Sequence, residues 1–82
     1  MIFLIEYNRQ KEAIVKFERF KNSDRTKAED RRFEIELDLN QRKVNHEVVL
    51  LEAYNEQGLR RTHKRYFQSL EESLKEKNNL LS

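Results

Sequence analysis

The chain contains no cysteine, no proline and no tryptophan, and it has one glycine among its 82 residues. Without cysteine there is no disulfide, no thiolate metal ligand and no cysteine nucleophile, and this composition fits a reducing compartment. The single glycine, Gly58, argues against a glycine-rich loop that binds phosphate with its backbone N–H groups. HExxH and GxSxG patterns are absent too, and two histidines without further ligand spacing are a weak metal signal. We therefore expect neither a metal nor a cofactor.

Long apolar segments are also missing. The opening MIFLI is followed at once by Glu6, and it lacks the basic region and the longer apolar run of a signal peptide. No stretch approaches the roughly 20 apolar residues that a membrane-spanning helix needs. These features predict a soluble, cytoplasmic protein that does not enter a membrane.

Charge is abundant but nearly balanced, with 17 basic and 15 acidic residues and a net charge of +2. Such a balance does not by itself attract nucleic acid. The distribution is uneven, because residues 24–38 hold six acids, whereas the segment Leu59–Phe67, LRRTHKRYF, holds four bases and no acid. This basic segment is the strongest candidate for an interaction surface.

A length of 82 residues predicts a single domain. We expect it to span residues 1–77 and to leave 78–82 as a frayed tail. A chain this short buries only about 60–65% of the surface that its unfolded form exposes. The core is therefore thin, and self-association would help to stabilise it.

Three segments have the pattern of strands. Ile2–Tyr7 begins apolar on both faces, which is typical of a central strand. Ala13–Phe20 follows a polar hairpin loop and alternates apolar with charged residues. His46–Ala53 contains the unbroken run VVLL, which predicts a strand that is buried on both faces.

Residues 24–39 fit either a helix or a strand. As a helix, the segment has one apolar stripe, formed by Ala28, Ile35 and Leu39. Phe33 and Leu37 fall away from that stripe and would widen the buried face. Residues 32–40 also alternate strictly, which is a strand pattern. Cap residues at the start, opposite charges four residues apart and the scarcity of β-branched residues favour the helix, and the strand is kept as the alternative, with the order ββββα.

The last helix is expected to begin at its N-cap, Asn55, and to reach the region of Lys75. The order is then β-β-α-β-α, an α+β class. The simplest packing is a three-stranded antiparallel sheet with both helices on one face. If Phe3, Ile5 and Tyr7 point to the opposite, open face, that face is too apolar to stay wet, and a homodimer is expected.

On a helix, LRRTHKRYF divides into two surfaces. Leu59, His63 and Tyr66 share the apolar stripe. The four bases lie on the other side and form a candidate partner-binding face: Arg60, Arg61, Lys64 and Arg65. A solubilising helix face is the plainer interpretation of these bases.

Four residues are candidates for ligand binding or acid–base chemistry: His63, Tyr66, Glu52 and His46. Histidine has an unperturbed pKa of about 6.5, which suits proton transfer near neutral pH. The plainer interpretation of His63 is a packed side chain bonded to a carbonyl or to a carboxylate such as Glu52 or Glu47. For Glu52, the plainer interpretation is the solvent-facing end of a strand.

The stretches FLIEYNR, NSDR, HEVVLLEA and LRRTHKRYF together resemble a small family of uncharacterised bacterial proteins. The resemblance spans about Phe3 to Phe67. It implies a bacterial, stand-alone, cytoplasmic domain, and it brings no catalytic residues to this chain.

Three functional hypotheses follow. The leading one is a non-enzymatic interaction or regulatory module that forms a homodimer and meets a protein partner through its four bases. The alternative is weak nucleic-acid binding through the same helix. The third is small-molecule binding or catalysis around His63, so the sequence does not decide whether the protein is an enzyme.

Overall fold

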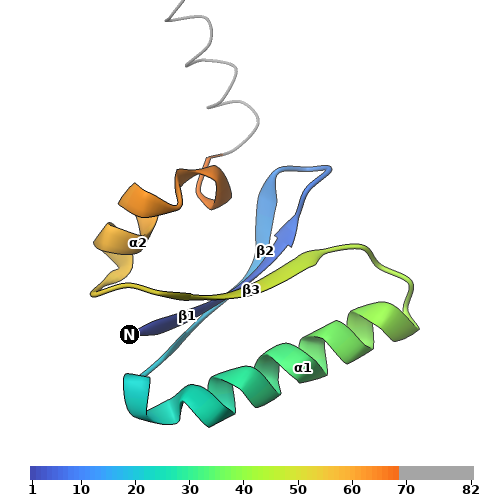
Figure 1. The fold of residues 1–82 in the computed structure, drawn as a ribbon. Helices are drawn as coiled ribbons and strands as arrows, with labels where there is room; N and C mark the ends of the chain where they lie inside the picture. The colour runs from blue at the N-terminus through green and yellow to red at the C-terminus, as the bar shows by residue number, and fades with distance from the viewer. Residues whose placement is uncertain (69–82) are drawn as a thin grey trace, which may run out of the picture.

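The computed structural model describes residues 1–68. They form the elements β1 (Ile2–Asn8), β2 (Ala13–Phe20), α1 (Arg25–Gln41), β3 (Glu47–Glu52) and α2 (Glu56–Thr62). A 3₁₀ turn precedes α1 at Asn22–Asp24, and another, η2, follows α2 at Lys64–Tyr66. The α+β class and the order β-β-α-β-α are confirmed (Figure 1). The predicted tail, residues 78–82, lies outside the described residues.

The sheet has the strand order β2-β1-β3, and both neighbouring pairs are antiparallel. β1 is the central strand, as its apolar start predicted. Asn8 closes the β1–β2 hairpin, because its Oδ1 accepts hydrogen bonds from the N–H groups of Gln10 and Lys11 at 3.0 and 3.1 Å. The register shifts beside Tyr7, which leaves Val15 as a bulge in β2.

Helix α1 covers one face of the sheet, so residues 32–40 form part of a helix rather than a strand. The predicted stripe of Ala28, Ile35 and Leu39 is buried. The apolar cluster beneath it is completed from the sheet and the following loop by Leu4, Phe20, Val44, Val48 and Leu50.

Two arginines fasten α1 to the two edge strands. Arg31 binds Glu18 of β2 through contacts of 3.0–3.1 Å, and Arg25 pairs with Glu52 of β3. These pairs join elements that are distant in sequence.

Helix α2 and η2 cover the opposite face, so the prediction that both helices share one face is wrong. Side chains alternate along β1, and both sets are apolar. Each face therefore needs a helix to cover it. Leu59 and Tyr66 pack against Phe3, Ile5 and Tyr7, and these three strand residues are buried. An open apolar face consequently cannot be the reason for self-association.

The last helix ends at Thr62 rather than continuing toward Lys75. His63 has φ −124° and ψ 54°, which is outside the helical region, and the Thr62 hydroxyl donates to the Gly58 carbonyl at 3.0 Å. The break turns the next residues back to the sheet, where Tyr66 meets Tyr7 edge to face with ring centroids 5.2 Å apart. The predicted start is confirmed, because the Asn55 side chain accepts a hydrogen bond from the Gly58 N–H at 2.8 Å.

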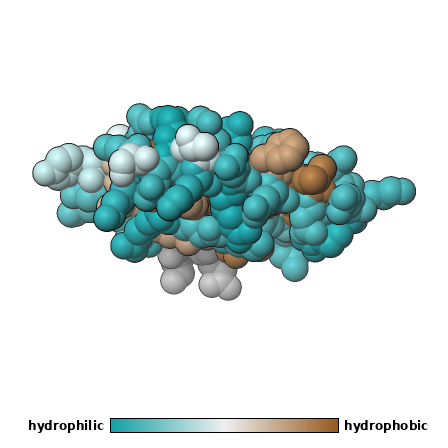
Figure 2. All heavy atoms as spheres, turned by 90° about the horizontal axis from the view of Figure 1, so that it is seen from below, coloured by the Kyte–Doolittle hydropathy of each residue, from teal (hydrophilic) through white to brown (hydrophobic). Residues whose placement is uncertain are grey.

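Two predictions of burial are wrong. Phe33 and Leu37 are 64% and 47% exposed, because the helical period turns them away from the sheet. The outer side of the molecule over α1 accordingly shows a small brown patch in a teal surround (Figure 2). β3 lies at an edge of the sheet, and its apolar residues Val48–Leu51 are half-buried rather than buried.

Among residues 1–68, no helix is both long enough and apolar enough to cross a membrane.

Candidate functional site

Two of the four predicted partner-binding bases are held by contacts within the protein. Arg60 pairs with Glu56 at 3.2 Å and lies 4.6 Å from the centroid of the Phe67 ring. Arg65 pairs with Glu47 at 2.8 Å. The break after Thr62 therefore redirects Arg65 toward the sheet, away from the face that a straight helix would share among all four bases.

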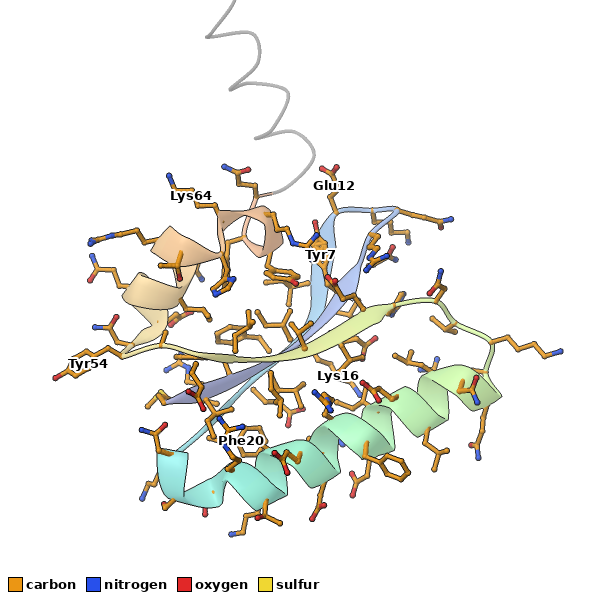
Figure 3. The ribbon with its side chains drawn as sticks, in the orientation of Figure 1. Tyr7, Glu12, Lys16, Phe20, Tyr54 and Lys64 are labelled. Carbon is orange, nitrogen blue, oxygen red and sulfur yellow. The ribbon has the colours of Figure 1, made fainter. Side chains whose placement is uncertain are left out.

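Arg61 and Lys64 remain available. Both are exposed, and neither forms an ion pair within the described part of the chain. Lys64 extends outward from the end of the fold (Figure 3). The structure thus reduces the candidate basic face to these two residues.

Glu47 is the centre of a polar cluster that fixes η2 to the sheet. Its carboxylate accepts hydrogen bonds from Arg9 at 3.0 Å and from Arg65 at 2.8 and 2.9 Å. Arg65 also donates to the Tyr66 hydroxyl at 2.7 Å and lies over that ring. The Tyr7 hydroxyl donates to the Arg65 carbonyl at 3.2 Å, so the cluster includes the central strand.

The protonation states of this cluster suit a static network. Burial alone would raise the pKa of Glu47, but the hydrogen bonds from Arg9 and the neighbouring donors outweigh it and hold the pKa below its ordinary value of 4.5. Burial, and after it the Glu12 carboxylate, raise the pKa of Tyr7, which the Arg65 charge only partly opposes. Glu47 is therefore ionised and Tyr7 protonated at neutral pH, and neither is poised to transfer a proton.

His63 is half-buried at the end of α2, with its ring centroid 6.4 Å from that of Tyr66. Tyr66 itself is a buried core residue, 6% exposed. Glu52 does not pair with His63: its side chain is 62% exposed and pairs with Arg25 on the α1 side of the sheet. The solvent-facing end of a strand is therefore the correct interpretation of Glu52.

His46 has the most defined environment of the predicted candidates. Its Nδ1 lies 2.7 Å from Oε2 of Glu6, a residue of β1 that is only 2% exposed. The carboxylate fixes the orientation of the imidazole and the position of the Nδ1 proton. Beside the ring is a cleft of about 320 Å³, lined also by Asn8, Arg9, Gln10, Lys43, Val44 and Asn45.

Sequence reasoning missed Glu6, although a signal was present. Glu6 has the same parity as Ile2 and Leu4 in a strand predicted to be central, so it had to face a covered side of the sheet. Its partner His46 is 40 residues away, and no local pattern connects the two positions. Within residues 1–68, no group of three or more His, Asp or Glu side chains is arranged to hold a metal ion.

No family model matches this chain, and neither a curated protein nor a solved structure matches it significantly.

Proposed function

We propose that this chain is a small, non-enzymatic interaction module that self-associates through the outer edge of β3. The observation that supports this proposal most strongly is the composition of that edge. The strand reads EVVLLE, with four half-buried apolar residues and charges only at its two ends. A long, apolar, unprotected edge is a template for pairing with another strand.

The other edge strand differs in the features that prevent pairing. β2 contains the bulge at Val15 and carries the charged side chains of Lys16, Glu18 and Arg19. Bulges and charges are the usual protection of a sheet edge. β3 has neither a bulge nor an internal charge, so β3 is the edge that is more open to pairing with another strand.

A second copy of the chain is the occupant that fits this edge. In an antiparallel pair related by a two-fold axis, the residues that face each other lie on the same side of the sheet. Glu47 pairs with Tyr7, and Glu52 pairs with Ile2, one on each side. The two acids therefore cannot oppose each other, and the apolar residues between them would gain burial in a six-stranded sheet.

Phe33 gains a role in this arrangement. Arg25 reaches toward β3 and Arg31 toward β2, and the helical period places Phe33 nearer to the side of Arg25. This side would face α1 of the second copy. The exposed ring would then be partly covered.

Sedimentation equilibrium at micromolar concentration tests the proposal. The wild-type chain is expected to form a dimer. Val49→Lys and Val49→Glu should each be monomeric, because like charges would meet at the centre of the interface, and an equimolar mixture of the two variants should form a heterodimer. Val15→Lys places the same charge on the protected edge and should leave the dimer intact.

A wild-type chain that is monomeric at every concentration would overturn the proposal. So would a Val49→Lys variant that keeps native circular dichroism and dimerises as strongly as wild type. The mixture separates loss of the interface from loss of folding, since an unfolded variant could not be restored by its oppositely charged counterpart.

Arg61 and Lys64 are the proposed partner-facing residues of the module, suited to an acidic protein surface. Nucleic-acid binding through the same two bases is the alternative, but Tyr66 and Phe67 pack against the sheet and do not offer a surface for base stacking. A labelled single-stranded DNA oligonucleotide distinguishes the two. The alternative requires anisotropy that falls steeply with salt and with Arg61→Gln, whereas a protein-binding face gives no binding at physiological salt.

Catalysis around His63 has no further support, because the half-buried ring contacts Tyr66 and is not among the residues lining the cleft beside His46. The resemblance to uncharacterised bacterial proteins and a cytoplasmic location remain predictions.

A further inference from the structure

We propose that the cleft beside His46 binds the phosphoryl group of a small phosphate compound, with the imidazolium of His46 and the ammonium of Lys43 as its cationic donors. The residues that line this cleft belong to one copy of the chain, and none of them is a basic residue of α2. It is assembled from the buried Glu6, the turn of the β1–β2 hairpin and the connection between α1 and β3.

The Glu6–His46 pair is difficult to explain by stability. Glu6 is the charged residue found buried among residues 1–68, on the side of β1 where Leu4 packs against α1. Replacing a buried ion pair by apolar residues is often neutral or stabilising. A chain with a thin core would therefore gain little by keeping a carboxylate at this position unless the pair had another use.

The geometry gives His46 one occupied and one open nitrogen. Nδ1 is bonded to Glu6 at 2.7 Å, while Nε2 has no hydrogen-bond partner within the described residues. The side chain is 18% exposed and lines the cleft. In the protonated ring both nitrogens donate, and the Glu6 charge balances the imidazolium. The Nε2–H group can then donate to an oxyanion in the cleft.

The cleft lining is cationic and rich in amide groups. It contains two bases and no acid, together with the side chains of Asn8, Gln10 and Asn45. Arg9 is shared with Glu47, so Lys43 is the free cation of the lining. A volume of about 320 Å³ is sufficient for a small phosphate ester.

The nearby end of α1 repels an anion less strongly than an uncapped end, because several of its last carbonyl groups are bonded by the backbone. The N–H groups of Val44 and Lys43 bond the carbonyls of Leu39 and Asn40 at 2.9 and 3.2 Å. These two bonds form a Schellman motif. The negative end of the helix is thereby closed by the backbone.

Lys43 occupies the position of that motif where glycine is the usual residue. Its φ of 57° is in the left-handed region, where a side chain strains the backbone. The sequence keeps a lysine there, at the mouth of a cleft that lacks any other unpaired cation. Strain at this position is independent of the Glu6–His46 pair, and both observations concern the same cleft.

The charged groups around His46 come from every neighbouring element. Glu6 lies on β1, Lys16 faces Glu6 from β2 on the α1 side of the sheet (Figure 3), and Lys43 follows α1. Arg9 comes from the hairpin loop, and Glu47 at the start of β3 points to the opposite side, where it binds Arg65. The charged groups named here are positive at the cleft apart from Glu6, which is bonded to the His46 ring at 2.7 Å.

NMR titration of the ¹⁵N-labelled full chain tests the site, first with inorganic phosphate and then with glycerol phosphate. The imidazole signals of His46 should shift saturably, whereas those of His63 should stay. A stronger response to glycerol phosphate assigns the site to phosphate esters, and an equal response assigns it to free phosphate. Val49→Lys should still bind phosphate, because His46 and Lys43 belong to one copy of the chain.

Lys43→Gly is the decisive variant. It relieves the left-handed strain, so the fold should be retained, while affinity should fall about tenfold, the scale of one lost charged hydrogen bond. Glu12 has a comparable φ of 50° but does not line this cleft, so Glu12→Gly repeats the backbone change and should leave binding unchanged. Parallel, non-saturating shifts of both histidines, or wild-type affinity in Lys43→Gly, would overturn the proposal.

Discussion

Replacing Lys43 with glycine should stabilise the protein, although it removes a side chain and adds none. An L-residue in the left-handed region costs roughly 1–2 kcal/mol, and φ at Lys43 is 57°. Glycine avoids that cost, but it also gives the unfolded chain more conformational entropy, which lowers the free energy of unfolding by about 0.5–1 kcal/mol. The variant also loses the favourable interaction of the Lys43 charge with the C-terminal end of α1, which contributes about 0.3 kcal/mol. The net expectation is a gain of about 0.2–0.7 kcal/mol, or about 1–6 °C in Tm for a chain of this size.

Thermal and urea unfolding followed by circular dichroism measure this change. Lys43→Ala removes the same side chain but keeps the strain, so its free energy of unfolding should stay within about 0.5 kcal/mol of wild type. Lys27→Gly makes the same exchange inside α1 and should destabilise by about 0.5–1 kcal/mol. If Lys43→Gly is no more stable than Lys43→Ala, the assignment of strain to this position is wrong.

Three further results are expected. Because the pKa of Glu47 is lowered on folding, its contribution to stability is complete above the ordinary pKa of 4.5 and should be lost as pH falls through the lowered pKa. Urea unfolding over this acidic range should show the loss in wild type, and Glu47→Gln should make the free energy of unfolding less dependent on pH there. Tyr66→Phe removes the hydroxyl that binds Arg65 and should cost about 0.5–1.5 kcal/mol, whereas Tyr66→Ala should cost about 3–5 kcal/mol; equal costs would show that the ring contributes nothing. Phe33→Ala and Leu37→Ala should each change the free energy of unfolding of the monomer by less than about 0.5 kcal/mol, measured by denaturation in the Val49→Lys background. A loss of about 2 kcal/mol or more, on the scale of core truncations, would place these side chains in the core.

The elements of the fold could be predicted because most local signals agreed. Cap residues and charge pairs selected a helix for residues 32–40 despite their strand-like alternation, and the doubly apolar start of β1 indicated a central strand. The positions of the helices could not be predicted in the same way. The return of Tyr66 to the sheet depends on the break at His63, and nothing in LRRTHKRYF favours that break over a continuous helix.

The candidate site was predicted only in part, for a related reason. His46 was named from its chemistry alone, but its function depends on Glu6 and on the cleft that Lys43 lines. Glu6 comes from β1, whereas Lys43 and His46 come from the connection between α1 and β3, and the fold brings these two segments together. Arg65 shows the opposite case, because its sequence pattern indicated a free base, whereas the tertiary structure pairs it with Glu47.

The most direct test of self-association is amide hydrogen exchange along β3, measured at several protein concentrations and compared with β2. In an edge strand, alternate N–H groups point away from the sheet and exchange rapidly unless another strand binds them. Pairing through β3 predicts that its outward amides become protected as concentration rises, while the outward amides of β2 exchange rapidly throughout. Outward β3 amides that exchange as rapidly as those of β2 at every concentration would contradict the proposal.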